Sequence, residues 1–562
     1  MRRISLLLLP VLAWIAWALL TLPPRSAALR VPAPSAGDPP VVRGAYHVHS
    51  QASDGTGTLE DIAAAAGRAG LRFVILTDHG DGFRRLPPPR YVGGVLCVEG
   101  AEISTSGGHY AALGMSAPPY PLGGEARDVV EDVARLGGFG IAAHPDSAKP
   151  ELRWDAWDTP FDALEWFNAD SQWRDERRWR LLPTILHYPV RPSEAVASLF
   201  DLPAGLVRRW DDLGSRRRIV GLAAADAHAR MGLGGKTDPY DELVYVKVPS
   251  YEAIFRAFSM RVELREALSG DPERDAAALL ASIRAGRVYT AFDSMAGPAS
   301  LAFSAESGGE VARQGDALPT RGPVRLRAVT NGTPQASVQL LRDGKVIRRV
   351  DGPSLEWETD QPGAYRIEAQ LPGAPGEPPL PWIVSNPIYV GLPATREHTG
   401  ALPPASARLV WPAGSWHIEK DARSTGRAVT SADGGLVRHT LRYELAREAA
   451  SPFVALGTTD VGAMHDAARI AFRAGADRPM RVSVQVRVLD GTVGRRWQRS
   501  VYLSPEPRDV TVTFADMRVV GTGAREALAP ARIHSLLFVL DSVNARPGDG
   551  GALWVEGIRT ER

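Results

Sequence analysis

Short apolar segments alternate with helical segments between residues 41 and 297. The apolar runs predict strands, which we place at residues 41–49, 73–76, 95–98, 139–143, 161–165, 219–225 and 287–290. Start and stop signals predict helices between them, at residues 58–70, 125–136 and 276–285. Strands and helices that alternate in this way indicate βα units, so residues 41–297 are predicted to form one α/β domain with a largely parallel sheet.

Near residue 298 the pattern changes to short strands of alternating apolar and polar residues, divided by proline and glycine. Asp343-Gly344, between two such segments, is a hairpin signal, and residues 480–488 alternate without a break, as in a sheet with one packed and one solvated face. We therefore predict two all-β sandwiches, an immunoglobulin-like one at residues 298–391 and a jelly-roll one at residues 406–562, with a linker at residues 392–405.

The second predicted sandwich is rich in tryptophan, at Trp411, Trp416, Trp497 and Trp554. With the alternating strands, these residues give it a general likeness to carbohydrate-binding modules. Tryptophans in a sandwich fill the core more often than they bind sugar, so core packing is the expected role and glycan contact through this sandwich is the alternative.

The first 30 residues carry a targeting signal. Arg2 and Arg3 precede an apolar run that extends from Ile4 to Leu22, which predicts export with the arginines left on the cytoplasmic side. Small residues at 26–28 fit a cleavage site, but the run is also close to the roughly 20 residues of a membrane span, so both a signal peptide and an uncleaved transmembrane anchor stay open. After a proline-rich linker at residues 31–40, we expect the protein to be periplasmic or membrane-anchored and facing out.

Charge and cysteine content exclude some classes of partner and bond. The chain has 562 residues, with 65 basic and 64 acidic ones, so its net charge of +1 gives no bulk attraction for nucleic acid, and none is predicted as a partner. Cys97 is the single cysteine, so no intramolecular disulfide can form.

The informative polar residues come directly after the predicted strands. His47 and His49 are two positions apart, which places both side chains on one face of a strand, and Asp54 follows in a turn. Later strands are followed by further residues of the same kinds: His79, Glu102 with Glu99 as a rival, His144, Asp226 and His228. Clusters of His, Asp and Glu favour divalent ions, so we predict a metal site at these strand ends.

The order and context of these motifs resemble the PHP (polymerase and histidinol phosphatase) family over roughly residues 40–295. The resemblance implies a distorted (βα)7 TIM-like barrel and metal-dependent phosphoesterase activity with two to three divalent ions, Zn, Mn or Fe. It also implies nine metal ligands: His47, His49, Asp54, His79, Glu102, His109, His144, Asp226 and His228.

Other residues of these motifs have predicted roles beside the ions. Asp226 or His144 is expected to transfer the catalytic proton. Glu165 and Asn168 are expected to support the ligands or contact the substrate, as the resemblance implies. The Arg230 and Lys236 side chains are candidates for neutralising a substrate phosphate.

We therefore expect an exported, metal-dependent hydrolase. The expected chemistry is that of a phosphoesterase, in which a hydroxide held between the ions attacks a small-molecule or cell-envelope phosphoester. A carbamate or amide ester hydrolase would use the same ligands, and a non-catalytic surface protein that binds metal or glycan is the alternative from another class.

Overall fold

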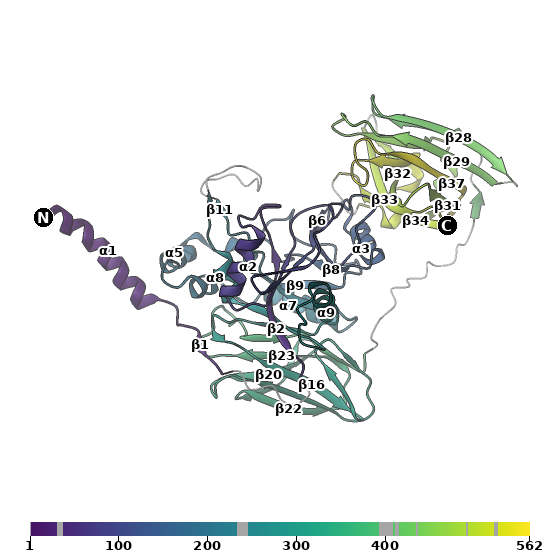
Figure 1. Ribbon diagram of the computed structural model, residues 1–562. Coiled ribbons are helices and arrows are strands. Elements are labelled where there is room, and N and C mark those ends of the chain that lie inside the picture. Colours follow the sequence, from purple (N-terminus) through teal and green to yellow (C-terminus); the bar gives the residue numbers. More distant parts are fainter. Residues whose placement is uncertain are drawn as a thin grey trace.

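The computed structural model describes residues 2–30, 38–232, 245–392, 408–410, 415–433, 436–490, 493–521 and 526–562 (Figure 1). A mixed α/β part comes first, and β-sandwiches follow it. This agrees with the sequence-based prediction at the level of a mixed α/β region followed by all-β regions.

Two sheets form the α/β part. In the first, β2 (Val41–Val48), β3 (Phe73–Leu76) and β5 (Val95–Glu99) are parallel, while β4 (Arg90–Val92), β13 (Ser259–Glu263) and β14 (Val288–Ala291) run antiparallel to their neighbours. The second has the order β10-β9-β8-β7-β6, with β6 (Ala101–Thr105), β7 (Gly108–Leu113), β8 (Phe139–Ala142), β9 (Ala163–Asn168) and β10 (Val220–Ala224).

Among the described residues, the two sheets meet through isolated bridges and a few further backbone hydrogen bonds. Val48 bridges Ala227 at one seam and His79 bridges Glu102 at the other. The predicted TIM-like barrel is therefore not confirmed, because the described strands do not form one closed ring. Regular pairing stops at these seams since the backbone there carries the polar motif residues, and β2 already shifts its register on β3 between Tyr46 and Val48.

The predicted helices form near their expected positions. α2 (Leu59–Arg68) starts with a capping box in which Thr58 and Asp61 bond each other's backbone N–H groups. α3 (Ala126–Arg135) and α9 (Pro272–Arg284) follow the other two predictions. The segment between β9 and β10 contains α4 (Ala169–Arg174), α5 (Arg178–His187), α6 (Pro192–Ala197) and α7 (Ala204–Gly214), and α8 (Tyr251–Ala257) precedes β13.

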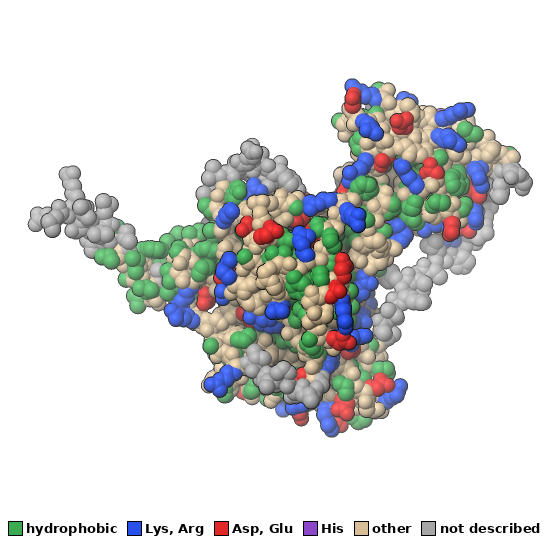
Figure 2. All heavy atoms as spheres, viewed as in Figure 1, with side chains coloured by type: hydrophobic (Ala, Val, Ile, Leu, Met, Phe, Trp, Pro, Cys, Tyr) green, Lys and Arg blue, Asp and Glu red, His purple; other side chains and the backbone are tan. Residues whose placement is uncertain are grey.

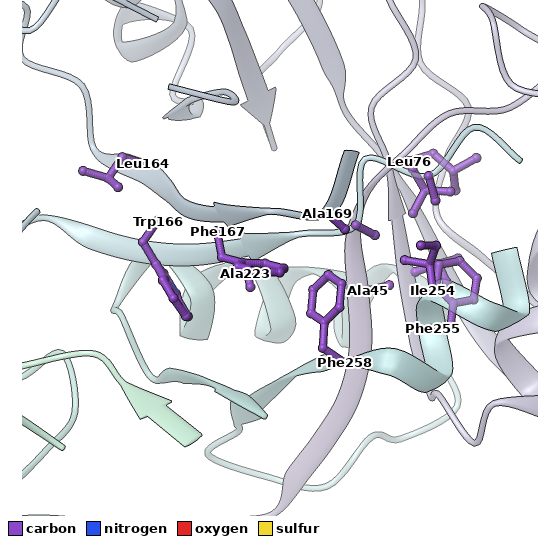
Figure 3. Packing of buried hydrophobic residues seen from close by; sticks show 14 of the residues in the cluster. Ala45, Leu76, Leu164, Trp166, Phe167, Ala169, Ala223, Ile254, Phe255 and Phe258 are labelled. Carbon is purple, nitrogen blue, oxygen red and sulfur yellow. The ribbon is translucent and has the colours of Figure 1, made fainter. Parts of the chain in front are cut away.

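Aromatic packing fixes β9 and β10 over the helices (Figure 3). Trp166 and Phe167 on β9 and Phe258 after α8 point into one cluster, in which the rings of Phe167 and Phe258 lie 5.2 Å apart. Trp166 stacks on Trp210 of α7. The strand that carries Glu165 and Asn168 is thus held rigidly from below.

The sandwich after residue 298 shares a sheet with the α/β part. β14 pairs with β24 (Ile383–Ser385), which also pairs with β23 (Gly363–Gln370), so one 12-stranded sheet runs through both. That sheet also includes β18 (Ala317–Leu318), β20 (Ser337–Arg342), β21 (Lys345–Asp351) and β25 (Ile388–Val390). The facing sheet consists of β16 (Leu301–Ser307), β17 (Glu310–Arg313), β19 (Val324–Thr330) and β22 (Ser354–Thr359). Asp343 and Gly344 have positive φ at the β20–β21 turn, as the hairpin signal predicts.

The C-terminal sandwich has a core of its own. One sheet contains β26 (Arg408–Val410), β28 (Thr425–Asp433), β29 (Leu436–Glu444), β31 (Arg469–Ala476), β34 (Arg508–Thr513) and β37 (Gly550–Glu561). The other contains β27 (His417–Lys420), β30 (Phe453–Thr458), β32 (Met480–Asp490), β33 (Val493–Leu503), β35 (Arg518–Val519) and β36 (Ile533–Asp541). Trp497 is buried in the core, Trp416 and Trp554 are half-buried, and Trp411 lies outside the described residues.

Buried ion pairs attach this sandwich to α3. Arg481 on β32 donates from Nη2 to Asp132 at 2.7 Å and from Nε to the same carboxylate at 2.8 and 2.9 Å. Arg499 bonds Glu131 at 2.7 Å. All of these groups except Glu131 are largely removed from water, so the contact depends on each charge having its partner.

At the other end of the molecule, α1 (Arg2–Thr21) projects away from the α/β part (Figure 1). The short pairs β1 (Ala27–Ala28) with β15 (Ala296–Gly297), and β11 (Met231–Gly232) with β12 (Tyr245–Val246), complete the strands. Over the described residues, no helix is both long and apolar enough to cross a membrane.

Candidate metal centre

All nine predicted ligands come together where the two sheets of the α/β part meet. Groups of three or four of them have donor atoms within 4.8 Å of one another, and together these groups include His47, His49, Asp54, His79, Glu102, His109, His144, Asp226 and His228. Glu99, the rival of Glu102, belongs to no such group of described residues and pairs with Arg90 at 3.5 Å.

Four atoms form one compact set at the β2–β10 seam. His47 Nε2 lies 3.2 Å from Glu102 Oε2 and 3.5 Å from Asp226 Oδ1, and His49 Nε2 lies 3.2 and 3.4 Å from the same two oxygens. A tetrahedral ion with bonds of about 2.1 Å separates its ligands by about 3.4 Å. Each of these four spacings is close to that separation.

Asp54 is the centre of a second set. Its Oδ2 lies 3.3 Å from His228 Nε2 and 3.6 Å from His79 Nε2, while Oδ1 lies 3.4 Å from His49 Nδ1. Asp78 holds the loop that carries Asp54 in place, because its carboxylate accepts hydrogen bonds from Ser50 and Ser53.

Glu102 connects the first set to a third. Its Oε1 lies 2.8 Å from His109 Nδ1 and 2.7 Å from His144 Nε2, while Oε2 lies 3.2 Å from His79 Nδ1. This carboxylate therefore has donor atoms of several histidines around both oxygens. A carboxylate in such a position is suited to bridging two ions.

One buried atom tests whether these residues fit a metal. His49 Nε2 is buried without a hydrogen-bond partner, although Glu102 and Asp226 are close, because neither oxygen lies in line for a hydrogen bond. A buried polar atom without a partner is costly. An ion between the nitrogen and the two oxygens would satisfy all three, so the donor set fits a divalent metal.

Hydrogen bonds orient the imidazoles toward this interior. Nδ1–H of His47 donates to Glu165 Oε1 at 2.6 Å, that of His144 to the Leu152 carbonyl at 3.1 Å, and that of His228 to the Asp226 carbonyl at 3.0 Å. Each bond keeps the proton on Nδ1 and directs Nε2 at the carboxylates, so that Nε2 is the nitrogen that would coordinate an ion. This is the arrangement that metal-binding histidines adopt in proteins.

The charged groups of the cluster shift one another's pKa. Burial alone would lower the pKa of His49, but the carboxylates of Asp226 and Glu102 outweigh it and raise that pKa to about 10. Burial would raise the pKa of Glu102, but the surrounding histidines, His47 first, hold it well below its usual range. The carboxylates are therefore ionised and their surroundings favour positive charge.

Three ligands have a left-handed backbone. φ is +62° at His47, +28° at His144 and +43° at Asp226, a region that costs roughly 1–3 kcal/mol for residues other than glycine. His47 and His49 do face the same cluster, but simple strand alternation is not the reason. A kink at His47, where the register of β2 shifts, turns its ring inward.

Glu165 and Asn168 lie behind the ligands. Glu165 is fully buried, and its Oε2 accepts hydrogen bonds from the His144 backbone at 2.7 Å and from Asn168 Nδ2 at 2.9 Å. Asn168 also donates to Asp226 Oδ2 at 3.1 Å, and its Oδ1 caps α4. The pair therefore joins three ligands, including both predicted proton-transfer residues, into one network.

Of the two predicted phosphate-binding side chains, Arg230 and Lys236, the structure describes only Arg230. Arg230 lies beside His228 with its guanidinium over the ring of Tyr245, at 5.1 Å from the centroid. Lys236 lies outside the described residues. Arg230, Asp226, His228 and Trp173 line a small pocket with a volume of about 10 Å³ beside the cluster.

Two residues near the centre have no motif in the sequence. Arg174, at the end of α4, pairs with Asp170, and the charges of Asp170, Asp226 and Asp54 raise its pKa although burial opposes them. Tyr251 on α8 donates to the carbonyl of His49 at 2.8 Å and anchors the ligand loop. In the sequence, no motif marks Arg174 as a residue near the site.

No protein-family model matches the chain, and no curated protein matches it. Among solved structures, it is similar to a two-domain protein from Bacteroides vulgatus that contains a predicted PHP-like metal-dependent phosphoesterase, with 14% identity, a TM-score of 0.28, and coverage of 61% of this chain and 94% of that one. It is also similar to a family 11 carbohydrate-binding module from Clostridium thermocellum, with 14% identity, a TM-score of 0.22, and coverage of 27% and 93%. A family 30 module shares 10% identity at a TM-score of 0.21, with coverage of 28% and 99%. These scores are too low to assign a function, which rests on the site itself.

Proposed function

We propose that the chain is a metal-dependent hydrolase whose substrate is a phosphoester. The observation that carries this proposal is the convergence of nine His, Asp and Glu side chains around shared carboxylates, with spacings that fit coordinated ions. The family resemblance of the motifs supports the same reading. When bound, two or three divalent ions, Zn, Mn or Fe, would supply an activated water and neutralise the charge that develops on the substrate.

The chain's own residues have distinct roles in this proposal. Glu102 and Asp54 supply negative charge that would attract the ions. Glu165 accepts a hydrogen bond from His47 Nδ1, which favours the tautomer with Nε2 free to bind an ion. Asp226 has one oxygen toward the ligands and the other on Asn168, so it is the better candidate for proton transfer. His144 donates Nδ1–H to Leu152 and is better suited to a ligand role.

Arginines beside the cluster favour phosphate over amide chemistry. Arg230 lines the pocket beside the cluster, and Arg174 pairs with Asp170, which lines the same pocket. Guanidinium groups bind phosphate oxygens in a bidentate way. A carbamate or amide ester hydrolase on the same ligands is the second candidate, because the ligand set does not depend on the bond that is cleaved.

Export and glycan contact belong to the same proposal. The apolar N-terminal run supports an exported protein that is periplasmic or anchored in the membrane and facing out. The C-terminal sandwich has half-buried Trp554 on its surface, with the Arg438 guanidinium 5.9 Å from the ring, and would supply glycan contact. A cell-envelope phosphoester would bring both features together.

The test is metal content and turnover of the full chain purified without chelator. We expect two or more equivalents of metal and metal-dependent release from p-nitrophenyl phosphate or its diester. His47→Ala and the nearly isosteric Glu102→Gln should lose both, whereas His417→Ala, which alters an exposed histidine of the second sandwich, should lose neither. Circular dichroism checks that each variant folds. Bound metal with hydrolysis of a carbamate or amide alone would select the second candidate, and absence of metal would contradict both and favour the non-catalytic binding protein.

A further inference from the structure

α5 exposes a row of large apolar side chains. Trp179, Leu182 and Ile185 lie three residues apart and are 67%, 58% and 54% exposed. At this spacing on a helix they form one stripe. Thr184 and His187, on the opposite side, are buried. The stripe thus faces away from the protein, and among the described residues nothing covers it.

α1 contacts α5 through His187, on the side away from the stripe, and has exposed apolar side chains of its own. The Trp17 ring stacks on that of His187 at a centroid distance of 5.0 Å, and Thr21 Oγ1 lies 2.9 Å from His187 Nε2. The exposed apolar residues of the described part of α1 are Leu12, Ile15, Trp17, Leu19 and Leu20. In Figure 2, hydrophobic side chains gather where α1 meets the body of the protein, with basic side chains at the border.

Positive charge accompanies this apolar surface. Residues 2–30 contain four arginines and no acidic residue. Arg191, just after α5, donates a hydrogen bond to the Pro23 carbonyl, which fixes the segment after α1 against the end of α5. A tryptophan-containing apolar stripe with arginines beside it is typical of helices that lie in the interface of an anionic bilayer.

We propose that the α5 stripe, Trp179, Leu182 and Ile185, contacts an anionic lipid bilayer beside α1. α5 lies in the plane of the interface, with its buried side on the protein and its stripe among the lipids. This contact goes beyond the proposed anchor, because it attaches the α/β part itself to the bilayer. It does not depend on hydrolase activity.

The contact can be tested on the full chain, because Cys97 is buried and an introduced cysteine is the accessible one. Leu182→Cys and the control Val311→Cys, which is 63% exposed on β17, are labelled with a polarity-sensitive fluorophore. The proteins are then reconstituted in phosphatidylglycerol and phosphatidylcholine vesicles. We expect a blue shift and loss of iodide quenching at position 182 in the anionic vesicles, and neither change at position 311.

Each other outcome would overturn the proposal. A label at position 182 that stays open to iodide on vesicle-bound protein would show that α1 alone makes the attachment. Protection without vesicles that grows with protein concentration would show that the stripe binds a second copy. A second measurement uses Leu182→Ser, for which we expect about tenfold weaker retention on anionic vesicles, against no loss for Val311→Ser.

Discussion

Glu165 offers the sharpest test of how the metal centre is built. Glu165→Gln keeps the shape of the side chain, but changes what each end can do. If the amide oxygen takes the place of Oε1, it still accepts from His47 Nδ1, without the negative charge that strengthens the 2.6 Å bond. The amide NH2 then meets two donors, the His144 backbone N–H and Asn168 Nδ2, which Oε2 accepts at 2.7 and 2.9 Å.

The expected cost follows from these contacts. Leaving buried donors without an acceptor costs roughly 1–3 kcal/mol each, and the opposite amide orientation would only move the conflict to His47. Loss of a group that orients a ligand typically lowers metal affinity about 10- to 100-fold, or about 1.4–2.8 kcal/mol. We expect Glu165→Gln to fall in this range.

The assay is competition for metal against a chromophoric chelator, with melting of the metal-free protein measured in parallel. Glu306→Gln, on the exposed face of β16, is the control and should bind metal like the unaltered chain. A Glu165→Gln affinity within twofold of the unaltered chain, in a folded protein, would refute the view that Glu165 positions the ligands.

Three further predictions concern other parts of the molecule. Arg174→Gln should raise KM for a phosphomonoester about tenfold with metal content unchanged, whereas Arg209→Gln on α7 should not; steady-state kinetics and metal analysis check both. Arg481→Met should weaken docking of the C-terminal sandwich by about 1.5–3 kcal/mol, because Asp132 loses its charged hydrogen bonds across the contact and keeps only Arg135 of its own helix, and calorimetry should then show a separate melting transition. Burial raises the pKa of Glu263 from 4.5 to about 7, so the folded state keeps a proton that the unfolded chain loses. Stability should therefore fall as pH rises from about 4.5 to 7 and level off above, and Glu263→Gln should flatten that slope in urea titrations at several pH values.

Most of the ligands could be predicted from the sequence because they lie at or shortly after the end of an apolar strand segment, whereas His109, inside β7, came from the family resemblance alone. The end of a strand is a local signal, and ends of neighbouring parallel strands meet without further information. The groups that orient the ligands have no such signal. The Leu152 carbonyl reaches His144 through backbone geometry, and Arg174 lies at the end of α4, a six-residue helix with no sequence motif.

The pairing of strands into sheets could not be predicted from the sequence either. The pairing of β14 with β24 joins residues almost a hundred positions apart, and an alternating pattern specifies that a strand has two faces without specifying its neighbour. At the seam where Val48 bridges Ala227, the neighbouring His47 and Asp226 have a left-handed backbone, which their residue types do not indicate in the sequence.

The strain and the chemistry of the centre occur at the same residues. Positive φ at His47, His144 and Asp226 destabilises the folded chain, yet each side chain is directed into the cluster by that backbone. Such strain persists only when the surroundings hold it in place, and here the Glu165–Asn168 network bonds to all three of these residues. The rigid packing of β9 behind that network, through Trp166 and Phe167, fixes where Glu165 and Asn168 stand. The hydrophobic core therefore determines the geometry of the centre through a single strand, and a change that loosens β9 should weaken metal binding even though it alters no ligand.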